Sequence, residues 1–143
     1  MTANAEELRK LYDAFGAGDV ATVLGAMDDK IDWQEPTGFP FESQTGPPAV
    51  AENIFGPITT QIEGFSVTPS EIIDGGDVVA AVGTYRGVGS ANGVPLDAEF
   101  VHIWRFGTDG KITGFRTYTD THLWRQALGV DWGRRGPEAP QVP

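Results

Sequence analysis

The chain contains no cysteine, and its 143 residues include only ten Lys and Arg against twenty Asp and Glu. Without cysteine there can be no disulfide, no thiolate metal site and no cysteine nucleophile. The formal net charge of -10 opposes contact with phosphate backbones and with anionic lipid surfaces. We therefore expect neither nucleic-acid binding nor membrane binding.

Long apolar runs, a leader sequence and paired metal ligands are also missing. No stretch approaches the ~18 apolar residues of a membrane-spanning helix, and the start MTANAEELRKLYDAF lacks the basic and apolar regions of a signal peptide. A cytoplasmic protein is expected. The two histidines, His102 and His122, show no spacing typical of metal ligands. We expect no metal and no other cofactor.

The pattern along the chain changes from helix to strand. Apolar residues three and four apart predict a helix near Leu8–Phe15 and a second one from Val20 to about Asp28. After a short strand, KIDWQEP, a third helix is predicted in AVAENIF, and four strands follow: FSVTPSEII, DVVAAVGTYRG, PLDAEFVHIWRF and KITGFRTYTD. This order predicts one α+β domain over residues 1–130, with three helices against a curved, mainly antiparallel sheet, and a loose tail over residues 131–143.

The strand EFVHIWRF places a histidine in a row of aromatic residues. If the turn TDG joins this strand to the next, Trp104 pairs with Phe115 and His102 with Thr117. His102 is then either a packed ring or a polar group kept in an apolar site. The shared face carries Phe100, His102, Trp104, Phe115, Thr117 and Thr119.

The opposite face of the same strand is apolar at Val101 and Ile103. A sheet that is apolar on both faces needs cover on both. Helices can cover one face, and a second subunit is the simplest cover for the other. We expect a homodimer through this face, with Arg105, Arg116 and Tyr118 around the contact.

A carboxylate and an imidazole together offer proton-transfer chemistry. Glu35 ends a strand just before Pro36, and the following segment TGFPFESQTGPP carries Phe39 and Phe41 as an ordered flap over something apolar. Desolvation would raise the pKa of Glu35 and make it a better base near neutral pH. His102, neutral because it is buried, would aim one free ring nitrogen at a ligand oxygen and stabilise an enolate. The alternative is a solvated glutamate and a packed histidine.

A family resemblance rests on NGVPLDAEFVHIWRFGTDGKITGFRTYTDTHL, the turn GAGDV and the segment DDKIDWQEPTG. Over roughly residues 5 to 128 the chain resembles the SnoaL-like branch of the ketosteroid isomerase and nuclear transport factor 2 superfamily. The resemblance implies a cone-shaped fold in which helices close a curved sheet around an apolar pocket. Glu35 matches the carboxylate that moves the proton, and His102 matches the acid that donates to the oxyanion.

The match fails at the oxyanion tyrosine of the isomerases. That position falls at Leu11, and Tyr12 lies about 100° further round the helix. The resemblance therefore implies an isomerase-like or polyketide-cyclase-like enzyme that moves a proton α to a carbonyl of an apolar substrate, without steroid isomerase activity. A non-catalytic module for binding hydrophobic ligands or for dimerisation is the alternative on the same fold.

The residues expected to contact a small apolar carbonyl ligand come from the strands, the flap and the third helix. Asp120 closes the last strand and could reach the pocket mouth, although alternation points it outward, where an ion pair or a helix cap would be its role. Beside the catalytic candidates Glu35 and His102, the expected contacts are Trp33, Phe39, Phe41, Phe55, Tyr85, Phe100, Trp104, Phe115, Thr117 and Thr119.

Overall fold

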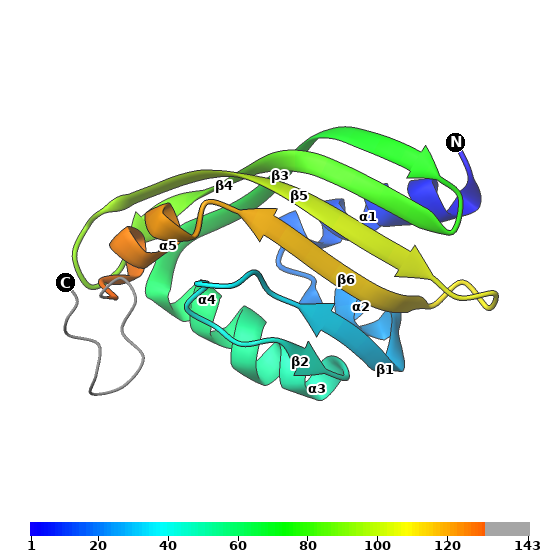
Figure 1. Ribbon diagram of the computed structural model, residues 1–143, viewed down its shortest axis with the longest axis horizontal. Helices are drawn as coiled ribbons and strands as arrows, with labels where there is room; N and C mark the ends of the chain where they lie inside the picture. Colours follow the sequence, from blue (N-terminus) through cyan, green and yellow to red (C-terminus); the bar gives the residue numbers. More distant parts are fainter. Residues whose placement is uncertain (131–143) are drawn as a thin grey trace.

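Two capped helices open the chain in the computed structural model, which describes residues 1–130 (Figure 1). Helix α1 (Ala3–Gly16) begins where Thr2 accepts a hydrogen bond from the Ala5 amide, and α2 (Val20–Gly25) begins where Asp19 accepts one from the Thr22 amide. The second helix is shorter than predicted. Met27 pairs with Ile112 and so begins a strand instead of ending the helix.

A six-stranded sheet follows, in the order β2-β1-β6-β5-β4-β3. The last four strands form the predicted antiparallel run, whereas β1 pairs in parallel with β6, so the sheet is mixed. The strands are β1 (Met27–Gln34), β2 (Gln44–Thr45), β3 (Ile62–Gly75), β4 (Val78–Gly89), β5 (Pro95–Phe106) and β6 (Ile112–Thr119). The predicted α+β class is confirmed.

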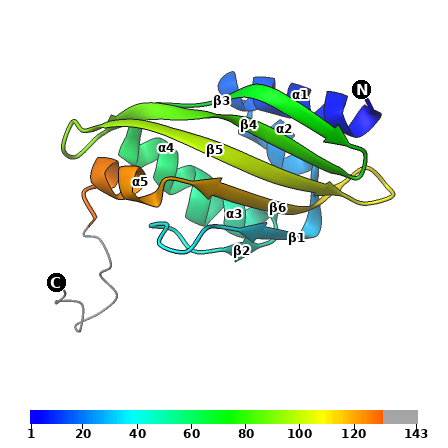
Figure 2. The same cartoon turned by 45° about the horizontal axis from the view of Figure 1, so that its top comes forward.

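The third predicted helix is longer than AVAENIF and has three parts. Pro47 and Pro48 open α3 (Pro47–Val50), which continues through a π-helical segment, η1 (Ala51–Phe55), into α4 (Gly56–Gln61). A further short helix, α5 (Thr121–Leu128), follows β6. Helices α1 to α4 lie on one side of the curved sheet, and α5 lies at the end away from the N-terminus (Figures 1 and 2).

The register of the last hairpin is the one predicted from the TDG turn. Trp104 pairs with Phe115, and His102 pairs with Thr117. Irregular pairing of β3 with β4 at two places, next to Glu63 and next to Pro69, is typical of β-bulges, which bend a sheet. The aromatic row of β5 is buried, and His102 and Trp104 line a space together with residues of α1, so the row lies on the concave face, toward the helices.

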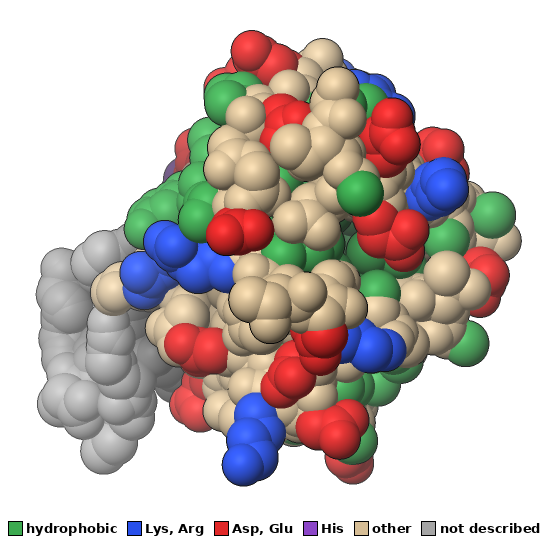
Figure 3. Space-filling view, turned by 90° about the vertical axis from the view of Figure 1, so that its right-hand side faces the viewer, with side chains coloured by type: hydrophobic (Ala, Val, Ile, Leu, Met, Phe, Trp, Pro, Cys, Tyr) green, Lys and Arg blue, Asp and Glu red, His purple; other side chains and the backbone are tan. Residues whose placement is uncertain are grey.

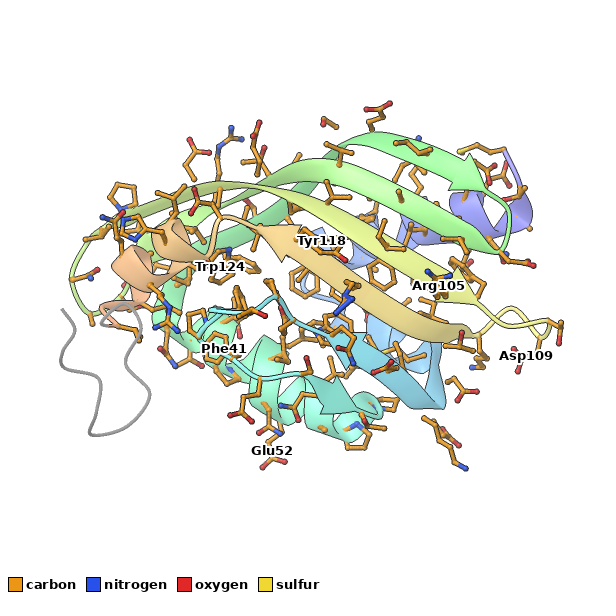
Figure 4. All side chains as sticks on the ribbon, in the orientation of Figure 1. Phe41, Glu52, Arg105, Asp109, Tyr118 and Trp124 are labelled. Atoms are coloured by element: carbon orange, nitrogen blue, oxygen red, sulfur yellow. The ribbon has the colours of Figure 1, made fainter. Side chains whose placement is uncertain are left out.

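The convex face of the sheet carries apolar side chains among charged ones. Val101 and Ile103 are half-buried, and Tyr118 is 51% exposed. Figure 4 shows Tyr118 and Arg105 projecting from this face. In the side view of Figure 3, hydrophobic side chains lie at the left margin of the picture, with basic side chains directly below them. Within residues 1–130, no helix is long and apolar enough to cross a bilayer. The prediction of a loose tail concerns residues 131–143, outside the described residues.

Candidate active site between the sheet and the helices

A cavity of about 70 Å³ lies between the concave face of the sheet and the helices. Its walls are almost entirely aliphatic and aromatic, and four lining residues with polar side chains are Glu35, Tyr12, Tyr85 and His102. Eight of the residues singled out in the sequence line it, namely Trp33, Glu35, Phe39, Phe55, Tyr85, His102, Trp104 and Phe115. Whether they bind a ligand stays a prediction.

Four of the expected contact residues do not line the cavity. Phe100 stacks on the far side of the His102 ring, with 3.8 Å between ring centroids. Thr117 lies behind Tyr85, with 3.2 Å between the two hydroxyl oxygens. The Thr119 hydroxyl donates to the Glu99 carbonyl at 2.7 Å, and Phe41 packs on the flap next to Phe39. Phe100, Thr117 and Phe41 thus contact residues that line the cavity, whereas Thr119 bonds to a residue that does not.

Asp120 does not reach the cavity. Its carboxylate caps α5 by accepting hydrogen bonds from the amides of His122 and Leu123. The helix that it starts brings Trp124 to the cavity, as Figure 4 shows at the α5 end of the molecule. Of the two outward roles considered for Asp120, an ion pair and a helix cap, the structure shows the helix cap.

The cavity also contains residues that strand alternation could not reveal. Leu8, Leu11, Tyr12 and Phe15 line it from α1, and Trp124 lines it from α5. The apolar spacing of α1 predicts a buried face correctly, but it carries no sign that the face borders a cavity. Only the way in which α1 crosses the sheet decides that.

Glu35 has one anchored carboxylate oxygen and one without a partner. The indole nitrogen of Trp33 donates to Oε2 at 2.7 Å, and the Glu35 amide donates to the Ser43 hydroxyl at 2.9 Å. Oε1 is buried without a hydrogen-bond partner among the described residues. Burial raises the pKa of Glu35 to about 8, against the smaller lowering effect of the Trp33 hydrogen bond. The carboxyl is thus held in place with one oxygen unused.

His102 has no ring nitrogen available for a ligand, and the prediction of a free one is wrong. Nδ1 lies 2.6 Å from the hydroxyl of Tyr12, and Nε2 lies 2.5 Å from the hydroxyl of Tyr85. Both partners are side-chain hydroxyls. The ring is 3% exposed, and its burial lowers the pKa of His102 well below the usual range, so the imidazole is neutral as predicted.

Tyr12 lines the cavity, although it lies about 100° round the helix from Leu11. Its hydroxyl contacts His102 and also accepts a hydrogen bond from the Trp104 indole at 2.9 Å. Leu11 and Tyr12 both line the cavity, because the buried stripe of a helix is at least about 100° wide and holds both positions. A tyrosine therefore lines the cavity one residue after the position at which the resemblance places the tyrosine of the isomerases. Burial raises the pKa of Tyr12 above its usual value, so the phenol keeps its proton.

Residues 1–130 contain no group of three or more His, Cys, Asp and Glu side chains that could hold a metal ion. The lining residues with polar groups carry instead one carboxyl, two phenols, an imidazole and three indoles, and the indole nitrogen of Trp124 is buried without a hydrogen-bond partner among the described residues. Such groups can take up, hold and donate protons. The chemistry that they suit is proton transfer and hydrogen-bond donation.

The buried carboxyl should make the stability of the protein depend on pH. Glu35 has a pKa of about 8 in the fold against an ordinary value of 4.5, so between these values the folded state binds the proton more tightly than the unfolded state. The free energy of unfolding should then fall as pH rises from about 4.5 to about 8. Glu35→Gln should remove that fall and leave the variant more stable at pH 9 by on the order of a few kcal/mol.

Urea unfolding of both proteins at pH 5, 7 and 9 measures this difference. Glu52→Gln is the matched control, because Glu52 is exposed on η1 (Figure 4). Parallel stability curves for Glu35→Gln and the unaltered protein would contradict the raised pKa.

Comparisons with known proteins agree with this architecture. A sequence profile described as the SnoaL-like domain matches residues 8–115. Among proteins of curated function, none matches the chain significantly. Among solved structures, an NTF2-like protein from Burkholderia thailandensis E264 is 28% identical, with a TM-score of 0.83 over 90% of this chain and 98% of that one.

Two further structures have names that refer to small molecules. TerC, co-crystallised with polyporic acid, is 26% identical, with a TM-score of 0.78 over 90% of this chain and 99% of TerC. IdmH from Streptomyces antibioticus, a proposed polyketide cyclase, is 20% identical, with a TM-score of 0.73 over 90% of this chain and all of IdmH (100%). The likeness to IdmH shows the fold alone.

Proposed function

The chain belongs to the SnoaL-like domain family, and from this membership we propose that it is a cofactor-independent enzyme that moves a proton α to a carbonyl group of an apolar small molecule. The observation that carries the proposal is the Oε1 atom of Glu35. It is a buried carboxylate oxygen without a partner among the described residues, on a residue that lines an otherwise apolar cavity. An oxygen of this kind suits the abstraction of a proton from a bound ligand.

The proposed reaction begins with proton abstraction by Glu35. Oε1 takes the α-proton, and the electron pair of the broken C–H bond moves to the carbonyl oxygen as an enolate forms. The Tyr12 hydroxyl, itself held by the Trp104 indole, donates a hydrogen bond to that oxygen. Return of the proton from Glu35 to another carbon completes an isomerisation. Alternatively, attack of the enolate carbon on a second carbonyl carbon gives an alkoxide, and transfer of the proton from Glu35 to that oxygen completes a cyclisation.

The lining of the cavity indicates the class of substrate. None of the described residues that line it is Lys or Arg, so a carboxylate or phosphate would enter without a counter-charge. The walls include the aromatic side chains of Trp33, Phe39, Phe55 and Trp124, which favour flat ligands. The crystallisation of TerC, which is 26% identical to this chain, with polyporic acid supports a small-molecule ligand here.

The size of the cavity implies that the flap, residues 36–43, moves when substrate binds. A space of about 70 Å³ is roughly half of the ~150 Å³ that holds benzene in an apolar protein cavity. The flap is held at α5, where the Arg125 side chain donates to the Gly38 carbonyl at 2.6 Å and Phe39 packs on Trp124. Outward movement of Phe39 would enlarge the cavity without a change in the sheet.

The test is proton exchange with solvent. Incubation with a panel of neutral cyclic ketones in D₂O, followed by proton NMR, should show loss of the α-proton signals of at least one member faster than in buffer alone. Tight binding of the panel without exchange would contradict the enzyme and support the binding module. The absence of both α-proton exchange and ligand binding would contradict the enzyme and the binding module alike.

We also propose that the protein forms a homodimer through the convex face of the sheet. Val82, Val101 and Tyr118 are neighbours across three strands there, with Arg105 toward one end and Glu99 toward the other. A two-fold axis that lies in the interface and runs across the strands brings the basic end of one copy over the acidic end of the other. The face is therefore complementary to itself in charge.

Sedimentation at micromolar concentration should give twice the chain mass of 15.3 kDa. Ile103→Glu should reduce the dimer to monomer, because it places a carboxylate in the apolar centre of the face. Gln61→Glu, at an exposed residue of α4 on the helix side of the sheet, serves as the control of equal charge. A monomer of unaltered protein at these concentrations would remove the proposal.

A further inference from the structure

A chain of hydrogen bonds runs from the interior of the sheet to the cavity. It links Thr117 to Tyr85 at 3.2 Å, Tyr85 to His102 Nε2 at 2.5 Å and His102 Nδ1 to Tyr12 at 2.6 Å. Trp104 joins it from the side, because its indole N–H donates to the Tyr12 oxygen at 2.9 Å. Every member is buried, and none is a carboxylate or a cation. The direction of donation along the chain is therefore set by the tautomer of His102.

The two neutral tautomers run the chain in opposite directions. With the proton on Nε2, His102 donates to Tyr85, Tyr85 donates to Thr117, and the Tyr12 proton points at Nδ1. With the proton on Nδ1, Thr117 donates to Tyr85, Tyr85 donates to Nε2, and His102 donates to Tyr12. In the second arrangement the Tyr12 oxygen accepts from both His102 and Trp104, and its own proton is free.

Each tautomer leaves one hydroxyl proton without an acceptor within the hydrogen-bond chain. The two tautomers leave this proton at different residues, and these residues have different surroundings. The Nε2–H form leaves the proton of Thr117, which is 2% exposed, lies behind Tyr85 and does not line the cavity. The Nδ1–H form leaves the hydroxyl proton of Tyr12. Tyr12 is a lining residue of the cavity, so a ligand oxygen in the cavity can accept this proton. Because a buried donor without an acceptor is destabilising, the Nδ1–H form is favoured once an acceptor occupies the cavity.

We propose that His102 is a positioning residue that carries its proton on Nδ1 and thereby directs the Tyr12 hydroxyl into the cavity as the donor to the ligand. This inference rests on the proposed function and deepens it, because it fixes the ligand atom at Tyr12 as a hydrogen-bond acceptor, such as a carbonyl oxygen. His102 then never touches the ligand. Its place between two tyrosines sets the direction in which Tyr12 donates.

The tautomer can be read directly from the ¹⁵N shifts of the His102 ring in uniformly labelled protein at pH 7. Since a protonated and an unprotonated ring nitrogen differ widely in shift, a proton on Nδ1 in the presence of cyclohexanone as acceptor probe supports the inference. A proton on Nε2 under the same conditions overturns it. His122, exposed on α5, gives the reference signal of a solvated imidazole and is identified by His122→Gln.

Two variants test the direction of the chain. Tyr12→Phe removes the acceptor of the Nδ1 proton, so the proton should move to Nε2, where Tyr85 accepts it. Thr117→Val keeps the shape of the side chain and removes the acceptor that the Nε2–H form needs for the Tyr85 proton, so the proton should stay on Nδ1. Movement of the proton to Nε2 in Thr117→Val, or its retention on Nδ1 in Tyr12→Phe, would contradict the proposed direction.

The NMR signature does not depend on turnover, so the two proposals can fail separately. An Nδ1 proton in a protein that exchanges no ketone supports the role of His102 and contradicts the enzyme. An Nε2 proton in a protein that catalyses α-proton exchange of ketones supports the proposed enzyme and contradicts the positioning role of His102.

Discussion

Glu35→Gln is expected to slow α-proton exchange by about 10²- to 10⁴-fold, the range that a positioned general base contributes. Glutamine has nearly the shape of glutamate, and its amide oxygen can still accept the hydrogen bond that Trp33 donates to Oε2 at 2.7 Å. What the variant lacks is a basic oxygen in the place of Oε1, which is buried without a partner among the described residues. The loss should therefore fall on the rate of the chemical step while ligand binding changes little.

The pH dependence of exchange separates the role of a base from a structural role. Since the carboxyl has a pKa of about 8, the rate with unaltered protein should rise with pH and level off above about 8, as the base becomes fully ionised. Glu35→Gln should lose that rise. Glu52→Gln, which changes an exposed carboxyl, should keep both the rate and the profile. Equal rates for Glu35→Gln and the unaltered protein would show that another group removes the proton.

The sequence predicted the sheet well because its signals are local. The TDG turn fixes the pairing of Trp104 with Phe115, and alternation then places the whole aromatic row on one face. The end of the second helix was predicted about three residues too late, because Met27 fits an apolar helix face as well as the start of a buried strand. Pairing with Ile112, far away in the sequence, decided between the two.

The candidate site was predicted less completely, because its polar contacts join distant elements. Glu35 was expected to be a desolvated carboxyl and His102 a neutral ring, and the directions of both pKa shifts agree. The partners of His102 could not be foreseen. Tyr12 and Tyr85 reach it from α1 and β4, 90 and 17 residues away. Counting positions along α1 alone excluded Tyr12, whereas the crossing of α1 over the sheet makes Tyr12 a lining residue of the cavity and brings its hydroxyl to His102.

Tyr12→Phe is the second change with a large expected effect, a fall of about 10²- to 10³-fold in the rate of exchange, as for the removal of one oxyanion donor. The phenol ring and its packing stay, and only the hydroxyl is lost. Two donors then lack an acceptor, the Trp104 indole and the Nδ1–H of His102 if the proton remains there. A stability loss of roughly 1–3 kcal/mol should accompany the change, and thermal unfolding must show that the variant is folded at the assay temperature.

The fall should appear in kcat more than in KM, because the charge that Tyr12 stabilises on the carbonyl oxygen develops only as the enolate forms. Tyr118→Phe, at the exposed tyrosine of the convex face, is the matched control and should leave both constants unchanged. Tyr85→Phe makes the comparison sharper, since Tyr85 also lines the cavity and also bonds to His102, but on the Nε2 side. If Tyr12 is the donor, Tyr85→Phe should cost clearly less than Tyr12→Phe. An equal or larger fall in the rate for Tyr85→Phe would indicate that Tyr85, and not Tyr12, donates to the oxyanion.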